Sequence, residues 1–94
     1  MPRAIYNGHV IAESDETVVV EGNHYFPPET VDEHLLADSP TRTLCSWKGE
    51  ATYHSLVIDD EVVADAAWSY EEPSPPASKI TGHLAFGPQV RVEP

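Results

Sequence analysis

The chain has 94 residues, enough for a modest hydrophobic core, and we expect a single domain over residues 1–94. Its five Lys and Arg residues against sixteen Asp and Glu residues give a net charge of -11. This balance argues against nucleic-acid and anionic-membrane partners, because both need clustered cations. The apolar runs are too short to span a membrane, the lone cysteine fits a reducing compartment, and no charged-then-apolar leader opens the sequence. We therefore expect a cytoplasmic protein.

The N-terminal third predicts two β-hairpins. Asn7-Gly8 is a strong signal for a two-residue hairpin turn, and Gly22-Asn23 marks a second turn. The strands predicted on either side of these turns cover Ala4–Tyr6, His9–Ala12, Thr17–Glu21 and His24–Phe26. The one short helix that we expect follows Pro27-Pro28, where acidic residues fill the first turns, and it ends by Ser39-Pro40.

The remainder of the chain alternates with the period of β-strands. Predicted strands cover Thr43–Trp47, Ala51–Ile58, Val62–Tyr70, Ile80–Phe86 and Val90–Val92. Asp59-Asp60-Glu61 is short enough for a hairpin loop, whereas the proline-rich segment Glu71–Ser78 cannot be a central strand. The fold class predicted from this pattern is mainly β, with antiparallel sheets.

The segment Thr43–Gly49 gathers the only cysteine, one of the two tryptophans and one of the two lysines. In one interpretation Lys48 reaches a concave site, where it pairs with a carboxylate or phosphate or, if burial lowers its pKa, acts as a nucleophile. In the other, Lys48 extends to solvent and pairs with a nearby acid such as Glu50. Cys45 is a weak catalytic candidate beside Lys48, and is otherwise a small buried hydrophobe.

A second group of candidate site residues consists of aromatic side chains. Trp68 and Tyr70 point the same way from one predicted strand, and together with Tyr25 and Trp47 they could line a pocket whose rim carries Lys48. Ser14 is a further candidate for hydrogen bonding to a ligand, although a serine before Asp-Glu is also a common turn former. The alternative is that the rings form the domain core. We expect no metal site, because no paired Cys or His spacing typical of zinc occurs.

The order of motifs along the chain closely resembles the DUF427 family, a set of small, mostly bacterial proteins of unknown activity that sometimes carry a nucleotidyltransferase label. The motifs are Asn7-Gly8, Ile11-Ala12-Glu13-Ser14, Tyr25-Phe26-Pro27, Cys45-Ser46-Trp47-Lys48-Gly49-Glu50-Ala51-x-Tyr53, Ala67-Trp68-Ser69-Tyr70, Pro73 and Ile80-x-Gly82-His83-Leu84-Ala85-Phe86. The resemblance implies a β-tent (Mss4-like) arrangement, in which two antiparallel sheets splay around a ligand-accepting cleft. Many proteins of that architecture hold a structural zinc, but this chain lacks the two Cys-x-x-Cys knuckles, so we expect none.

We therefore expect a small-molecule-binding β domain without a cofactor. Its predicted ligand site consists of Ser14, Tyr25, Trp47, Lys48, Trp68 and Tyr70. In this site the rings stack on the ligand, Lys48 pairs with an anion, and Ser14 gives polar support. An enzyme acting on a small metabolite or nucleotide through Cys45 or Lys48 is the first alternative. A protein-interaction module that uses an exposed sheet edge is the second.

Overall fold

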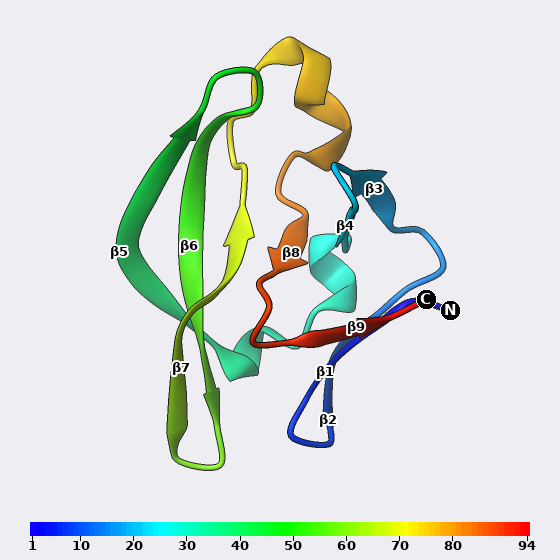
Figure 1. Ribbon diagram of the computed structural model, residues 1–94, viewed down its shortest axis with the longest axis vertical. Coiled ribbons are helices and arrows are strands. Elements are labelled where there is room, and N and C mark those ends of the chain that lie inside the picture. The colour runs from blue at the N-terminus through cyan, green and yellow to red at the C-terminus, as the bar shows by residue number, and fades with distance from the viewer.

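The computed structural model describes residues 1–94, which form nine β-strands and three short 3-10 turns (Figure 1). The strands are β1 Arg3–Tyr6, β2 His9–Glu13, β3 Val18–Val20, β4 Asn23–Tyr25, β5 Leu36–Cys45, β6 Gly49–Ile58, β7 Glu61–Ser69, β8 Leu84–Phe86 and β9 Arg91–Glu93. The 3-10 turns are η1 Pro28–Thr30, η2 Glu33–Leu35 and η3 Pro75–Ile80.

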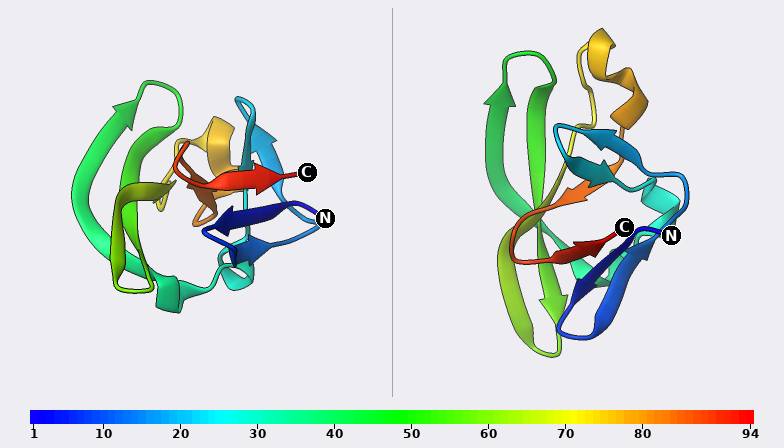
Figure 2. Two further views of the ribbon diagram at one scale, coloured as in Figure 1. Left: turned by 60° about the horizontal axis from the view of Figure 1, so that its bottom comes forward. Right: turned by 45° about the vertical axis from the view of Figure 1, so that its right-hand side comes forward.

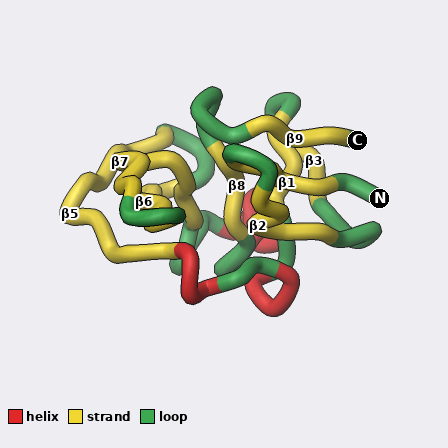
Figure 3. The backbone as a smooth tube through the Cα atoms, turned by 90° about the horizontal axis from the view of Figure 1, so that it is seen from below, coloured by secondary structure: helices red, strands yellow, loops and turns green.

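The strands form three sheets in which every pair of neighbours is antiparallel. The largest sheet has the order β5-β6-β7-β8, the second has the order β2-β1-β9, and β3 pairs only with β4. Figure 2 shows the long strands β5, β6 and β7 curving along one side of the molecule, with the smaller sheets facing them. Seen from below, the β1, β2 and β9 group lies opposite the β5, β6 and β7 group (Figure 3). The mainly β, antiparallel prediction is confirmed, whereas the β-tent arrangement stays a prediction.

Three tight turns join the predicted hairpins, although two of them differ from the predicted turn residues. Asn7 and Gly8 have φ values of 50° and 82°, so both central residues of the first turn adopt the left-handed conformation. The second turn has the same form at Glu21 and Gly22, one residue earlier than predicted. Asp59 and Asp60 make the third turn with φ values of 51° and 66°, and aspartate tolerates this conformation better than most residues.

The predicted short helix after the double proline is wrong, because the segment makes two separate 3-10 turns, η1 and η2. Between them Val31 forms an antiparallel bridge with Ala12, and the Asp32 amide donates a 2.9 Å hydrogen bond to the Ile11 carbonyl. These bonds to β2 hold the backbone extended where a helix would need it coiled. Strand β5 then begins at Leu36, inside the region predicted as helical.

Two predicted strands are shorter than expected. Of the range Ile80–Phe86 only β8 is a strand, because Gly82 turns the chain with a φ of 71° and donates a 3.0 Å hydrogen bond to the Tyr70 carbonyl. The strand predicted to end at Trp47 ends at Cys45, so that Trp47 and Lys48 lie in the turn between β5 and β6. The side chain of Lys48 therefore projects from a turn and not from a strand face.

The alternation of β7 is interrupted at Asp65. This residue has a φ of 52°, and the pairing of β7 with β6 shifts register beside it. The Asp65 carboxylate accepts hydrogen bonds of 2.5 Å from the Ser39 hydroxyl and 2.8 Å from the Thr41 hydroxyl, both on β5. Because of this irregularity the residues from Val62 to Tyr70 do not keep the single alternation predicted for them.

The buried side chains form two adjoining clusters. The larger one centres on Phe26, Leu56 and Phe86 and fills the space between the four-stranded and three-stranded sheets. The smaller one contains Tyr25 and Tyr70 and lies between β4, η3 and the four-stranded sheet. Residues 25 and 26 therefore send neighbouring aromatic rings into different clusters, as alternate residues of an extended segment do.

Candidate functional site

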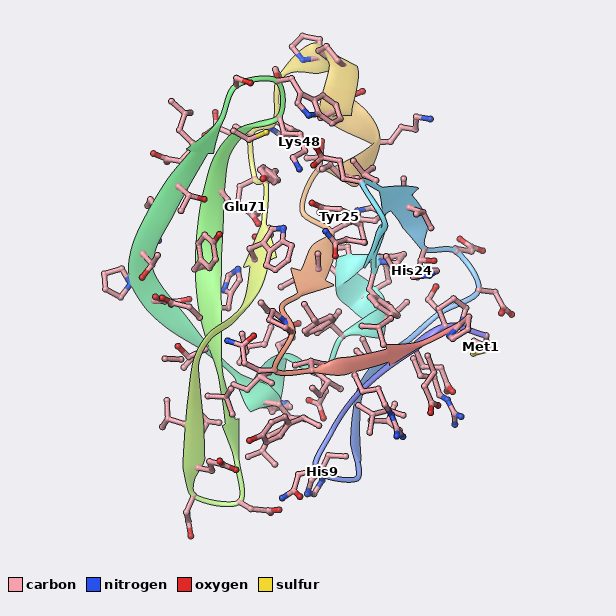
Figure 4. All side chains as sticks on the ribbon, in the orientation of Figure 1. Met1, His9, His24, Tyr25, Lys48 and Glu71 are labelled. Carbon is pink, nitrogen blue, oxygen red and sulfur yellow. The ribbon has the colours of Figure 1, made fainter.

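Lys48 lies at the tip of the β5–β6 hairpin, yet its side chain is only 7% exposed. The hairpin tip is attached to the segment that leads into η3, because the Ser74 amide donates a 3.0 Å hydrogen bond to the Lys48 carbonyl and the Ser74 hydroxyl donates to the Trp47 carbonyl. This attachment directs the ammonium inward, toward the ring of Tyr25 (Figure 4). Of the two interpretations of Lys48, the one in which it extends into solvent and pairs with an acid such as Glu50 is wrong, because the side chain is buried and its acidic partner is Glu21.

The partner of the buried ammonium is Glu21, at the turn of the β3–β4 hairpin. One oxygen of the Glu21 carboxylate accepts from Lys48 Nζ, and the other accepts a 3.4 Å hydrogen bond from Trp47 Nε1. The Glu21 side chain itself is 52% exposed. Lys48 and Trp47 together thus hold one carboxylate at two points, and that carboxylate belongs to a half-exposed side chain.

Two aromatic rings also lie close to the ammonium. Lys48 Nζ lies 5.3 Å from the centre of the Tyr70 ring and 5.6 Å from the centre of the Trp47 ring, both within the range of a cation–π interaction. The Tyr25 and Tyr70 rings are 6.4 Å apart, and Trp68 Nε1 donates a 3.2 Å hydrogen bond to the Tyr25 hydroxyl. The four rings and the lysine therefore form one connected unit, the Lys48 cluster.

The electrostatics of the Lys48 cluster favour a permanently charged lysine. Burial acts to lower the pKa of Lys48, but the hydrogen bond to Glu21 and the nearby Tyr25 and Tyr70 hydroxyls outweigh burial and raise it to about 12. Hydrogen bonds from Lys48 and then Trp47 lower the pKa of the Glu21 carboxyl. A nucleophilic lysine needs a lowered pKa, so this arrangement suits ion pairing and not covalent catalysis by Lys48.

The largest cavity of the molecule lies elsewhere, between the four-stranded sheet and the segment that holds η1 and η2. It has a volume of about 630 Å³, and we refer to it as the His54 cavity. Its lining residues are Pro28, Glu29, Val31, Glu33, Leu36, Asp38, His54, Ser69, Glu71, Gly82 and Leu84. On its wall His54 Nε2 lies 3.0 Å from the Ser69 hydroxyl oxygen, and the Ser69 hydroxyl donates a 2.5 Å hydrogen bond to Glu71.

A family profile described as a domain of unknown function, DUF427, matches residues 2–93. The chain belongs to the DUF427 family. The resemblance drawn from the sequence motifs is thereby confirmed. No curated protein matches this DUF427 chain.

The DUF427 structure brings together five of the six residues predicted to bind a ligand, namely Tyr25, Trp47, Lys48, Trp68 and Tyr70. Ser14 is separate from them. Its amide donates a 3.1 Å hydrogen bond to the Pro2 carbonyl beside the N-terminus, and its hydroxyl accepts from the Glu16 amide, which is the turn-forming role considered for it. Cys45 is half-buried and packs against the cluster that contains Tyr25 and Tyr70.

No open pocket faces the Lys48 cluster in this DUF427 chain. None of the three cavities of the molecule is lined by Tyr25, Trp47, Lys48, Trp68 or Tyr70. Tyr25 and Tyr70 are buried, whereas Trp47 is 39% exposed and the Glu21 side chain 52% exposed.

Two further observations concern metal sites and membrane-crossing helices. No three His, Cys, Asp or Glu side chains lie close enough together to hold a metal ion. No helical segment has the length and hydropathy that a membrane-crossing helix requires.

We expect Lys48 to titrate near pH 12, above the ordinary lysine value of 10.5. Because its pKa is raised in the folded state, the stability that Lys48 contributes is fully present below pH 10.5 and is lost as the pH rises through 12. Carbon NMR of the lysine Cε resonances across this range measures the midpoint. Glu21→Gln should lower the midpoint of the Lys48 titration, because burial lowers the pKa of Lys48 and the Glu21 carboxylate no longer raises it. An unchanged midpoint in that variant would contradict the assigned pairing.

Proposed function

We propose that this DUF427 domain binds a small molecule that carries a carboxylate on a flat ring, with Glu21 holding the carboxylate position when the ligand is absent. One observation supports the proposal most directly. A buried ammonium and an indole N–H converge on one carboxylate, and that carboxylate belongs to a half-exposed side chain on a different hairpin. A buried cation needs an anionic partner, but nothing in this geometry requires the partner to be Glu21.

The position of Glu21 makes exchange feasible. Strands β3 and β4 form a two-stranded sheet of their own, and such a hairpin contributes little stability by itself. Glu21 occupies its turn, where a side-chain rotation into solvent breaks no backbone hydrogen bond of the ladder. A ligand carboxylate can therefore replace that of Glu21 without unfolding either sheet.

The rings explain why the ligand should carry more than a carboxylate. Trp47 is 39% exposed, so one part of its indole can stack on a planar group that enters beside Lys48. Tyr70 lies against the ammonium from the inside, and the hydrogen bond between Trp68 and Tyr25 supports the rings behind it. In this proposal Trp47 and Lys48 touch the ligand, whereas Tyr25, Trp68 and Tyr70 position Lys48.

Titration with benzoate, and with benzamide as its uncharged counterpart, tests the proposal. We expect saturable binding of benzoate, monitored by amide NMR, with chemical-shift changes centred on the β5–β6 turn and on Gly22. Glu21→Gln removes the internal competitor and should strengthen benzoate binding, whereas Lys48→Met removes the cation and should abolish it. Glu50→Gln is the matched control, because Glu50 is an exposed acid two residues from Lys48 and no hydrogen bond or ion pair joins the two.

Binding of benzamide as tight as that of benzoate would rule out carboxylate recognition. Equal effects of Glu21→Gln and Glu50→Gln would show that general negative charge, and not occupancy of the site, governs the affinity. If Glu21→Gln lowered the affinity for benzoate, Glu21 would be a structural partner and not a stand-in for the ligand.

A single feature favours the protein-interaction alternative. Strand β5 is an edge of the four-stranded sheet, and Leu44 near its end is 82% exposed. Pro40 and the irregular register between Asp38 and Arg42 interrupt this edge, so only the short stretch after Arg42 is regular enough to accept another strand. We therefore rank strand addition second.

A further inference from the structure

The His54 cavity is independent of the Lys48 cluster. Four neighbouring strands line it with Leu36, His54, Ser69 and Leu84, and the segment that holds η1 and η2 lines it with Pro28, Val31 and Glu33. Glu71, labelled in Figure 4, follows β7 and is one of the residues that line the cavity. A volume of about 630 Å³ lies within the range of small-molecule sites in proteins.

The hydrogen bonds that line the cavity define which of its atoms donate and which accept hydrogen bonds. The Ser69 hydroxyl has one proton and donates it to the Glu71 carboxylate, which can only accept. His54 Nε2 must therefore carry a proton and donate it to the Ser69 oxygen. Burial lowers the pKa of His54, which favours the neutral ring, and in a neutral ring that donates from Nε2 the Nδ1 atom is an acceptor without a proton.

The remaining polar groups of the cavity accept hydrogen bonds as well. Glu29, Glu33, Asp38 and Glu71 bring carboxylates to the cavity, and no Lys or Arg is among its lining residues. Asp38 is the cross-strand partner of His54, so an acid flanks the imidazole on the β5 side as Ser69 and Glu71 do on the β7 side. Val31, Leu36 and Leu84 supply an apolar floor between these groups.

We propose that the His54 cavity is a second ligand site, which takes a small organic amine in its ammonium form. The ammonium group donates to the Glu71 and Asp38 carboxylates and to His54 Nδ1, and the hydrocarbon part rests on Leu36 and Leu84. The two proposed sites thus bind ligands of opposite charge. The Lys48 cluster presents donors to an anion, and the His54 cavity presents acceptors to a cation.

Titration with phenethylamine, and with 2-phenylethanol as the uncharged molecule of the same shape, tests the proposal. We expect saturable amide NMR shifts at His54, Ser69 and Leu84 for the amine, and binding at least about tenfold weaker for the alcohol, since the alcohol lacks the charge-assisted hydrogen bonds. Glu71→Gln should weaken amine binding by about tenfold for the same reason. Glu72→Gln is the matched control, because it removes an adjacent exposed carboxylate that does not line the cavity.

If Glu71→Gln does not fold, Asp38→Asn makes the same comparison from the opposite wall. Lys48→Met should leave amine binding unchanged, which separates this test from that of the carboxylate site. Shifts that never saturate, or that spread over the acidic surface, would overturn the proposal. Equal losses in Glu71→Gln and Glu72→Gln, or equal affinities for the amine and the alcohol, would also overturn it.

Discussion

Phe26→Ala is expected to lower the free energy of unfolding by about 3–5 kcal/mol, the usual cost of removing a buried phenylalanine side chain. Phe26 is fully buried in the larger core cluster, and its ring meets that of Phe86 edge-on at a centroid distance of 5.7 Å. Its backbone also joins β4 to β8, through hydrogen bonds of 2.8 and 2.9 Å with Leu84. The cavity left by the substitution lies where the two-stranded sheet meets the four-stranded one.

Urea unfolding of the variant and the parent protein measures this difference. Phe26→Leu is the control, because a nearly volume-conserving apolar replacement usually costs less than about 1.5 kcal/mol. A cost of Phe26→Ala no greater than that of Phe26→Leu would show that the ring is not tightly packed against Phe86.

Lys48→Glu is expected to lower the free energy of unfolding by about 3–5 kcal/mol, comparable to breaking a buried ion pair. The new carboxylate would lie among Tyr25 and Tyr70 and face Glu21, so the site would hold two negative charges with no cation between them. Lys48→Met should cost much less, because it keeps an unbranched apolar stem and leaves Glu21 free to turn into solvent.

The matched control is Lys79→Glu, which makes the same change at the other lysine, an exposed one, and should alter stability by less than about 0.5 kcal/mol. Adding Glu21→Lys to Lys48→Glu restores opposite charges in swapped positions and should recover part of the loss. If the double variant were no more stable than Lys48→Glu alone, the interaction of Lys48 with Glu21 would not be the cause of the destabilisation.

The hairpins could be predicted from the sequence because their signals are local. Asn7-Gly8 and Asp59-Asp60 each place residues that tolerate a positive φ between two alternating segments, and the structure turns at both. The short helix was mispredicted because the acidic residues after the double proline satisfy a local helix pattern, while the backbone bonds of Val31 and Asp32 to β2 come from a distant segment. Local propensity is weak against such tertiary bonds.

The Lys48 cluster was partly predictable. Its lysine and rings stand out by residue type, but the partner Glu21 lies 27 positions away along the chain, in a turn that carries no signal of pairing. The sequence also predicted a concave site, whereas the rings here are packed together. An alternating pattern shows which residues share a face, but it does not show whether a facing element fills the space above them.

The His54 cavity could not be predicted, and one irregularity explains why. Leu56 pairs with Val63, and if that register continued, His54 would lie opposite Asp65. The shift beside Asp65 sets His54 opposite Ala67 instead, which brings the Ser69 hydroxyl within reach of the imidazole. A sequence pattern reveals the alternation along one strand, but it does not reveal where two strands change register.

The indole of Trp47 donates to a carboxylate that we infer to be exchangeable, whereas the indole of Trp68 donates to the buried Tyr25 hydroxyl. The only two tryptophans of the chain therefore sit in environments that respond to different events. Fluorescence from Trp47 reports whether Glu21 or a ligand occupies the anion position. Fluorescence from Trp68 reports whether the buried cluster around Tyr25 remains folded. A variant with Trp47→Phe would silence the former signal and leave the latter, giving an optical means to separate ligand exchange from unfolding.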